Sequence, residues 1–452
     1  MRLFNIFCVS FIIVLRLKSV QLLDFEFHNN KALTNVLKNF SSMTRNGIDV
    51  KMYSIGKSTG IHDVKSEDMW VLEITAAQNL TGIPNVKLIS GVFGDEHIGT
   101  EILLHFVDYL ISSYETEKSV KYLLDNTRIH ILSRMNPSGY PITHGNPFRY
   151  DLDTMFPDLY KGPHGTPQLE SEAVMKWMND NYFVLSATLN YVYNNFDTME
   201  IIYPYNTKDL HQTSKESITS DNDVFKHLAN VYSTNYHSNI EQEINIRNGA
   251  KTRPTLRTMQ DYNYFKHGCM ELNIKIEDSS KYKKNTMKIQ QSFENNKKAL
   301  VEYYLQANQG VFGVIRDSET NEPIIARFKV IGREMLFKTN AAGEFWKILV
   351  PGNYKIEVSA DGYYRQNVSF QVNLTTPYPQ LTRLQILLVS KNTVTTTEST
   401  LTQPQSEMNT IHLKHIPEVI GPKIGARVSN ANRYNINLIL IFLSILAYVL
   451  CY

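Results

Sequence analysis

The chain has 452 residues, of which 42% are hydrophobic and 20% are charged. This length allows two domains or more, and the composition is that of an ordinary globular protein. The formal net charge of +2 gives no reason to propose nucleic acid as a partner.

Both ends of the chain are apolar. Residues 1–21 predict a signal peptide, because Arg2 is followed by an apolar run that is too short to span a bilayer. The alternative is a buried N-terminal element. Residues 435–452 carry no charge, and the small residues Ser429, Asn430 and Ala431 precede them, which favours a GPI-anchor signal over a transmembrane helix. We therefore predict an extracellular protein anchored to a membrane by its C-terminal tail.

The cysteines predict a chain without disulfide bonds, whose stability comes from its hydrophobic core. Cys8 and Cys451 lie in the two apolar ends, so that Cys269 alone remains in the mature chain. We interpret it as a buried structural thiol. Four N-glycosylation sequons fit an extracellular route; they begin at Asn39, Asn79, Asn367 and Asn373.

Residues 22–306 read as one α/β domain. Apolar periodicity predicts helices at residues 33–40, 98–114, 169–178 and 285–306, and strands at 52–58, 69–74, 86–89, 128–132 and 270–276. Another helix is expected to start near residue 224, with Ser220 as its N-cap and the Asp223 carboxylate three residues on. Strands that alternate with helices predict a mixed, mostly parallel β-sheet covered on both faces.

The remainder of the chain changes character at about residue 307. Residues 307–390 contain short apolar alternations separated by turn signals, which predict a small antiparallel β-sandwich. Residues 391–434 are rich in Ser, Thr, Gln and Asn and predict a flexible stalk, with O-glycosylation as an option.

One turn organises the large domain. Residues 91–101 (GVFGDEHIGTE) join an apolar strand to a helical stripe, at the kind of strand-to-helix turn where α/β enzymes present their chemistry. This turn resembles the zinc turn of the metallocarboxypeptidases, in the branch that contains carboxypeptidases E, N, M and D. The segments at residues 135–140, 151–158, 203–205 and 259–264 resemble further motifs of that family. The resemblance implies a carboxypeptidase-like domain followed by a transthyretin-like β-sandwich domain.

A zinc carboxypeptidase needs metal ligands, a general base and cations that hold the substrate. The resemblance places the three zinc ligands on Phe93, Glu96 and Asn190, and the general base on Lys275. A phenylalanine has no lone pair, a neutral amide is a poor zinc ligand, and an ammonium is not a base. Only Glu96 keeps the residue that the role requires, so we expect no catalytic residue and no zinc cofactor.

The positions that grip the substrate are altered as well. The resemblance places the oxyanion arginine on His144 and the pair that holds the terminal carboxylate on Asp153 and Thr154. It places the flexible pocket tyrosine on Arg253 and the aspartate that selects basic residues on Asn206. Asp153 is expected to put a negative charge where an anion binds in the family.

Other residues could replace the missing zinc ligands and the missing base, and each candidate also has a structural interpretation. His97, Glu101 and His105 are four residues apart and could form a metal stripe, but a solvated polar face is the favoured interpretation. We hypothesise that the Lys275 ammonium substitutes for the metal and pairs with Glu96; otherwise it points to solvent. Cys269 and His267 are not interpreted as a nucleophile and base, since their spacing does not place them together.

These inferences favour a cell-surface pseudoenzyme that binds a peptide or protein or acts as a structural module. The alternative is a zinc metallocarboxypeptidase with a rebuilt site, which removes C-terminal residues from peptides. A third possibility is that the β-sandwich is the working part and the large domain is a spacer.

Overall fold

A computed structural model of the chain describes residues 23–43, 47–60, 65–94, 96–139, 151–158, 168–191, 199–206, 215–237, 244–252, 254–276 and 286–391. The predicted signal peptide, stalk and hydrophobic tail lie outside these residues. Within the described ranges, no helix is both long enough and apolar enough to cross a membrane.

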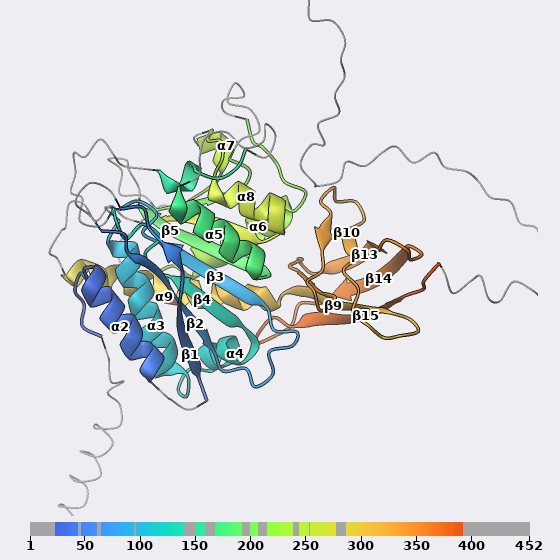
Figure 1. Ribbon diagram of the computed structural model, residues 1–452, viewed down its shortest axis with the longest axis horizontal. Helices are drawn as coiled ribbons and strands as arrows, with labels where there is room; N and C mark the ends of the chain where they lie inside the picture. Colours follow the sequence, from blue (N-terminus) through green and yellow to red (C-terminus); the bar gives the residue numbers. More distant parts are fainter. Residues whose placement is uncertain are drawn as a thin grey trace, which may run out of the picture. The chain divides into compact units, whose positions relative to one another are not determined.

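The larger part of the chain is built on one eight-stranded sheet (Figure 1), with the order β1-β2-β4-β3-β5-β8-β6-β7. Its strands are β1 (Asp49–Lys57), β2 (Asp68–Thr75), β3 (Asn85–Ser90), β4 (Arg128–Leu132), β5 (Phe183–Tyr191), β6 (Glu200–Tyr203), β7 (Asn245–Asn248) and β8 (Met270–Ile276). The central strands β4, β3, β5 and β8 are parallel, whereas β1, β2 and β6 make antiparallel pairs. The predicted mixed sheet is confirmed.

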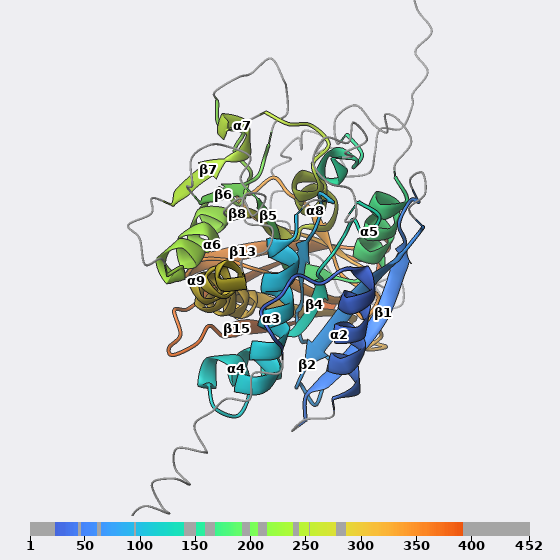
Figure 2. The same ribbon diagram turned by 90° about the vertical axis from the view of Figure 1, so that its left-hand side faces the viewer.

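Helices cover both faces of this sheet, as Figure 2 shows. One face carries α2 (Asn30–Ser42), α3 (Ile98–Ser113), α4 (Lys118–Asn126), α6 (Asn222–Asn235) and α9 (Thr286–Leu305). The other carries α5 (Leu169–Asp180) and α8 (Met259–His267). Shorter turns are η1 (Leu152–Thr154), α7 (Gly249–Thr252) and η3 (Gln306–Asn308). Because both faces are covered, β3 is buried along almost its whole length, including its one charged residue, Lys87.

Residues from Gly310 onward form two smaller sheets that enclose an apolar core. The first, β11-β10-β13-β14, contains β10 (Arg327–Val330), β11 (Phe337–Lys338), β13 (Gly352–Ser359) and β14 (Gln366–Val372). The second, β12-β9-β15, contains β9 (Gly310–Asp317), β12 (Glu344–Lys347) and β15 (Leu381–Leu388). The rings of Phe328 and Phe345, one from each sheet, lie 4.3 Å apart between their centroids. This arrangement agrees with the predicted β-sandwich.

One pairing differs from the predicted antiparallel pattern. The first strand of the sandwich, β9, pairs with the last, β15, in parallel, with Gly310 opposite Leu381. A parallel pair cannot be joined by a tight hairpin. Here β9 and β15 are the first and last strands of the sandwich, and the five strands between them in sequence form the long connection that a parallel pair needs.

A buried ion network joins the sandwich to the large domain. The Asp221 carboxylate accepts hydrogen bonds from Lys347 Nζ at 2.6 Å, Arg333 Nη1 at 2.6 Å and the Tyr264 hydroxyl at 2.7 Å. Arg333 also donates to both oxygens of Asp223. Asp221 and Lys347 are almost fully buried, so each compensates the charge of the other.

This network corrects one sequence prediction. Asp221, not Ser220, occupies the N-cap position of α6, and its side chain makes no capping hydrogen bond. The Asp223 carboxylate, which was expected to take part in the cap, instead binds Arg333 of the sandwich. The predicted helix itself is confirmed, starting at Asn222.

Candidate functional site

The turn after β3 is closed by Glu96. Its Oε2 accepts from the backbone N–H of Phe93 at 3.1 Å, and its own N–H donates to the Phe93 carbonyl at 3.0 Å. Glu96 is 3% exposed and lies just before the first turn of α3, where the helix dipole favours a carboxylate. Phe93 packs against the apolar cluster on the α5 and α8 face. Glu96 therefore stabilises the turn, and the Phe93 side chain offers no ligand atom.

The ends of β5 and β8 bring together the next two predicted positions. Asn190 lies directly opposite Lys275 in the parallel register of these strands, so both side chains lie on the same face of the sheet. Asn190 is buried, and its Nδ2 donates to Asn273 Oδ1 at 3.1 Å. Lys275 is half-buried. The structure thus places an ammonium beside an amide at the carboxyl edge of the sheet.

The hypothesised pair between Lys275 and Glu96 is not formed. The ion pairs of the described residues include none between these two side chains. The alternative was that Lys275 points to solvent, and the structure leaves its side chain half-buried.

Asp153 differs from its predicted role as a negative charge. Burial raises the pKa of its carboxyl group to about 8, with further contributions from the charges of Asp151, Glu271 and Asp261 and an opposing one from Lys275. Asp153 is therefore mostly protonated at neutral pH. Next to it, the Thr154 hydroxyl donates to the Asp151 carbonyl at 3.0 Å within η1. Neither residue supplies a cation for a terminal carboxylate.

The hydrogen bonds of Asn206 are all made within the protein and stabilise the end of β6. Its backbone N–H donates to the Asp261 carboxylate, and its Nδ2 lies 3.0 Å from oxygens of Thr258, Gln260 and Asp261. Gly249 lies so close that a Cβ there would be 2.3 Å from Asn206 Oδ1. These contacts hold the β6 end against α8. His144 and Arg253 lie outside the described residues.

The favoured interpretation of the stripe on α3 is wrong. Glu101 and His105 are buried, not solvated, because the segment before α2 covers this side of the helix. His28 Nδ1 lies 2.7 Å from Glu101 Oε2, and the Phe25 ring lies 4.0 Å from that of His105. Burial lowers the pKa of His105 to about 4. His97 is half-buried at the N-cap of α3.

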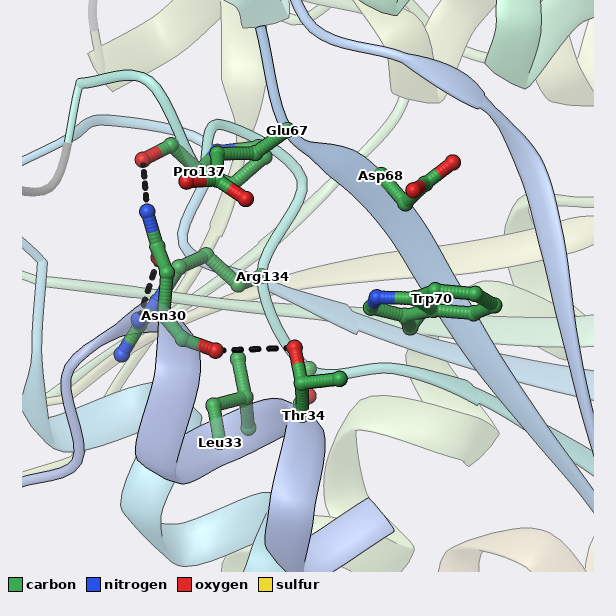
Figure 3. Close-up of a pocket in the computed structure, with 9 residues that line it drawn as sticks. Asn30, Leu33, Thr34, Glu67, Asp68, Trp70, Arg134 and Pro137 are labelled. Atoms are coloured by element: carbon green, nitrogen blue, oxygen red, sulfur yellow. Dashed lines mark hydrogen bonds between the residues drawn. The ribbon is translucent and has the colours of Figure 1, made fainter. Parts of the chain in front are cut away.

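The same N-terminal segment borders a small polar hollow beside β2 and α2 (Figure 3). Asn30 accepts from Arg134 Nη1 at 2.8 Å and donates to the Pro137 carbonyl at 2.8 Å. Arg134 also donates to the His28 carbonyl. These bonds fix the segment after β4, which forms a wall next to the turn of Glu96: Gly139 there lies against Gly94. The hollow belongs to this support and not to the edge that holds Asn190 and Lys275.

Cys269 is a buried thiol, as expected. Burial raises its pKa to about 12, so that it remains protonated. Burial lowers the pKa of His267 to about 4. A buried, protonated thiol is a poor nucleophile, which agrees with the prediction that Cys269 and His267 are not a nucleophile and base.

Sequence reasoning missed a buried polar column beneath the site. Lys87 Nζ donates to Ser186 Oγ at 2.7 Å and to Glu271 Oε2 at 3.0 Å, and Asn263 Nδ2 donates to the same carboxylate oxygen at 2.7 Å. All these groups lie in buried strands or on α8. The signal was visible as single charges, Lys87 and Glu271, inside otherwise apolar strands.

The residues at the metal positions do not fit zinc. Phe93 cannot coordinate a metal, Glu96 binds the backbone of its own turn, and the Asn190 amide is neutral. No group of three or more His, Cys, Asp or Glu side chains in the described ranges is arranged to hold a metal ion. The assignment of these residues to the roles of the family remains a prediction.

The fold and these motifs define a class of protein, and comparison with known proteins agrees. The pattern of the zinc carboxypeptidase family (peptidase M14) matches residues 41–299, so the chain belongs to this family. It is 32% identical to carboxypeptidase M of Mus musculus over 392 residues, which cover 80% of this chain and 84% of that protein. The predicted membership of the branch with carboxypeptidases M, D and N is confirmed.

Two further proteins show how far the similarity extends in sequence and in fold. The chain is 31% identical to carboxypeptidase D of Homo sapiens over 76% of its length, but it spans only 26% of that longer protein. A solved structure of thrombin activatable fibrinolysis inhibitor superposes with a TM-score of 0.50 at 15% identity, covering 62% of this chain and 76% of the other. At this identity the likeness concerns the fold alone.

Proposed function

We propose that the chain is a non-hydrolytic member of the zinc carboxypeptidase family that binds a peptide or protein at the carboxyl edge of its large sheet. The observation that carries the proposal is the chemistry of four positions. Phe93 and Asn190 replace the two histidine ligands expected from the family, Lys275 replaces the base, and Glu96 is used by its own turn. A scaffold that keeps its strands and turns without these groups is suited to binding rather than hydrolysis.

Zinc content and peptidase activity test this proposal. The full chain, purified without chelators, is expected to hold far less than one zinc per molecule and to release no C-terminal residue from peptides. The alternative, a metallocarboxypeptidase with a rebuilt site, requires about one zinc per chain and release that stops when a chelator is added. That result would overturn the proposal. His97 and His105 would then be the first residues to mutate, since Glu101 already binds His28.

A role for the β-sandwich alone is less favoured. Lys347 and Trp346 are buried where the sandwich meets the large domain, with Lys347 bound to Asp221 and the Trp346 ring 5.5 Å from that of Tyr182. An isolated sandwich would expose these groups. Partner binding is therefore best tested in the full chain, with substitutions placed in one domain at a time.

We also propose an extracellular, membrane-anchored location. The apolar tail at residues 435–452 and the leader at residues 1–21 motivate it, with a GPI anchor preferred to a transmembrane helix. The four sequon asparagines, Asn39, Asn79, Asn367 and Asn373, have exposed side chains, which glycosylation requires. Release from intact cells by phosphatidylinositol-specific phospholipase C, and a mass shift with an N-glycosidase, are expected. Retention on the membrane after lipase treatment would favour the transmembrane helix.

A further inference from the structure

The carboxyl ends of β5 and β8 carry polar groups whose binding capacity is not used. Asn190 is 4% exposed, and its Oδ1 atom is buried with no hydrogen-bond donor in the described part of the chain. Its Nδ2 is occupied by Asn273. A buried acceptor without a partner is destabilising by about 1–3 kcal/mol, so such an atom at the edge of a sheet calls for an external donor.

In the register of the sheet, Lys275 lies between Asn190 on β5 and Glu200 on β6. Its half-buried ammonium makes no hydrogen bond or ion pair with any residue that the structure describes. Four residues earlier on the same face of β8, Glu271 shows the opposite situation. It accepts from Lys87, Ser186, Thr188 and Asn263. Within one strand, Glu271 thus has several hydrogen-bond donors inside the protein, whereas Lys275 at the strand's end has no hydrogen-bond partner among the described residues.

The acidic side chain whose charge couples to Lys275 does not neutralise it at neutral pH. Asp153 is mostly protonated there, since its pKa is raised to about 8 by burial and by the neighbouring carboxylates. A protonated Asp153 neither competes for the ammonium nor repels an anion. The buried Glu200 lies opposite Lys275 on β6, but among the described residues it forms no ion pair with the ammonium. The edge therefore has one cation without an ion-pair partner and one acceptor without a donor.

We propose that Lys275 and Asn190 form a binding site for a carboxylate that carries an amide N–H on a neighbouring atom. The ammonium donates to the carboxylate, and Asn190 Oδ1 accepts from the N–H. A free peptide C-terminus has both groups, and so do small N-acylated amino acids. The peptide form of the ligand rests on the proposed function. The site uses the positions of a lost metal ligand and a lost base, rather than Asp153 and Thr154, and no bond is broken in it.

Three small probes separate the two contacts. N-acetylglycine carries the carboxylate and the N–H, acetate carries only the carboxylate, and N-acetylglycinamide carries no charge. Binding to the full chain is measured by ligand-observed saturation-transfer NMR at pH 7. N-acetylglycine is expected to bind at least about ten times more tightly than N-acetylglycinamide, as a charge-assisted hydrogen bond implies, and more tightly than acetate.

Variants assign the binding to these residues. Lys275→Met should weaken N-acetylglycine at least about ten-fold, Lys275→Arg should retain most of the binding, and Asn190→Asp should abolish it by adding a negative charge. Lys266→Met, which removes an exposed lysine of α8, is the matched control and should have no effect. Retention by Lys275→Arg shows that the ligand needs a cation at this position, and chemical denaturation of Lys275→Met shows that this variant is folded. Equal binding of the acid and the amide, or no binding of N-acetylglycine at all, overturns the site.

A pool of random hexapeptides, prepared as free acids and as C-terminal amides, distinguishes this inference from the proposed function. Preference for the free acids that Lys275→Met abolishes supports both. Equal binding of acids and amides leaves the proposed function standing and rejects the carboxylate site. Binding of N-acetylglycine without binding of either peptide pool supports the site and rejects peptide recognition.

Discussion

Two charged regions of the described chain contrast in how their charges are satisfied. Where the sandwich meets the large domain, Asp221 receives three donors, and the buried Lys347 has a carboxylate at 2.6 Å. At the carboxyl edge of the sheet, Lys275 and Asn190 Oδ1 have no partner among the described residues. Charges that stabilise a fold are paired within it. The carboxylate site proposed above uses the two groups that remain without a partner at this edge.

The largest expected effect is at the paired region. Asp221→Asn leaves Lys347 buried without its counter-charge, so the free energy of unfolding should fall by about 3–5 kcal/mol. Urea denaturation of the full chain measures this change. Asp223→Asn is the control: Asp223 is 48% exposed, and its loss should lower stability by less than about 1 kcal/mol. Equal effects of the two variants would contradict the comparison.

The N-terminal segment gives an intermediate effect with a pH dependence. Glu101→Gln removes the charged partner of His28 and should lower the free energy of unfolding by about 2 kcal/mol at pH 6. Burial opposes the charged form of His28, but the hydrogen bond and charge of Glu101 and the charge of Glu26 outweigh it and raise its pKa. The stabilisation is thus complete below pH 6.5 and is lost as the pH rises through the raised pKa.

Thermal melts of the wild type and of Glu101→Gln between pH 5 and pH 9 measure that loss. The difference between the two melting curves should narrow toward high pH. A difference that is constant over this range would mean that His28 does not carry a proton in the folded chain.

Substitution of Asp153 is expected to raise the free energy of unfolding, whereas the substitutions above lower it. The folded chain holds its proton up to pH about 8, whereas the unfolded chain releases it near pH 3.8. The free energy of unfolding should therefore fall as the pH rises between these values. Asp153→Asn removes this slope and should stabilise the chain at pH 8 by about 1–3 kcal/mol. Asp180→Asn, which removes one side of an exposed ion pair with Lys176 on α5, is the control and should change stability by less than about 1 kcal/mol.

The smallest effect on stability is expected for Lys275, which lies beside Asn190 at the carboxyl edge of the sheet. Lys275→Met should change the free energy of unfolding by no more than about 0.5 kcal/mol, because no described residue depends on its ammonium. Chemical denaturation beside Lys266→Met measures it. A loss above about 2 kcal/mol would place Lys275 among the structural charges and end the contrast between the two regions.

Much of the fold follows from sequence periodicity. The strands Arg128–Leu132 and Met270–Ile276 and the start of α3 at Ile98 agree with their predicted positions, because buried parallel strands and a core helix leave long apolar signals. β5 and α8 were not predicted as elements. Their polar members, such as Ser186, Thr188 and Asn263, break the apolar pattern, yet they are buried around Glu271.

The site was less accessible from the sequence. The positions Phe93, Asn190 and Lys275 were found through the resemblance, and the register of β5 with β8 places two of them together. The burial of Glu101 was not predicted, because the side chains that cover it belong to a segment more than 70 residues away in sequence. Likewise, the protonation of Asp153 depends on its burial and on carboxylates that include Glu271 and Asp261 from two other segments, which no local pattern reveals.

The parallel pairing of β9 with β15 has a consequence for biosynthesis. The sheet that they form remains incomplete until the last strand of the sandwich leaves the ribosome, whereas the strands and helices of the large domain are all synthesised earlier. Contacts between such distant segments form slowly. Arg333 and Lys347 are also synthesised after the whole large domain but before β15, so Asp221 can bind its cations before the second sheet of the sandwich is complete.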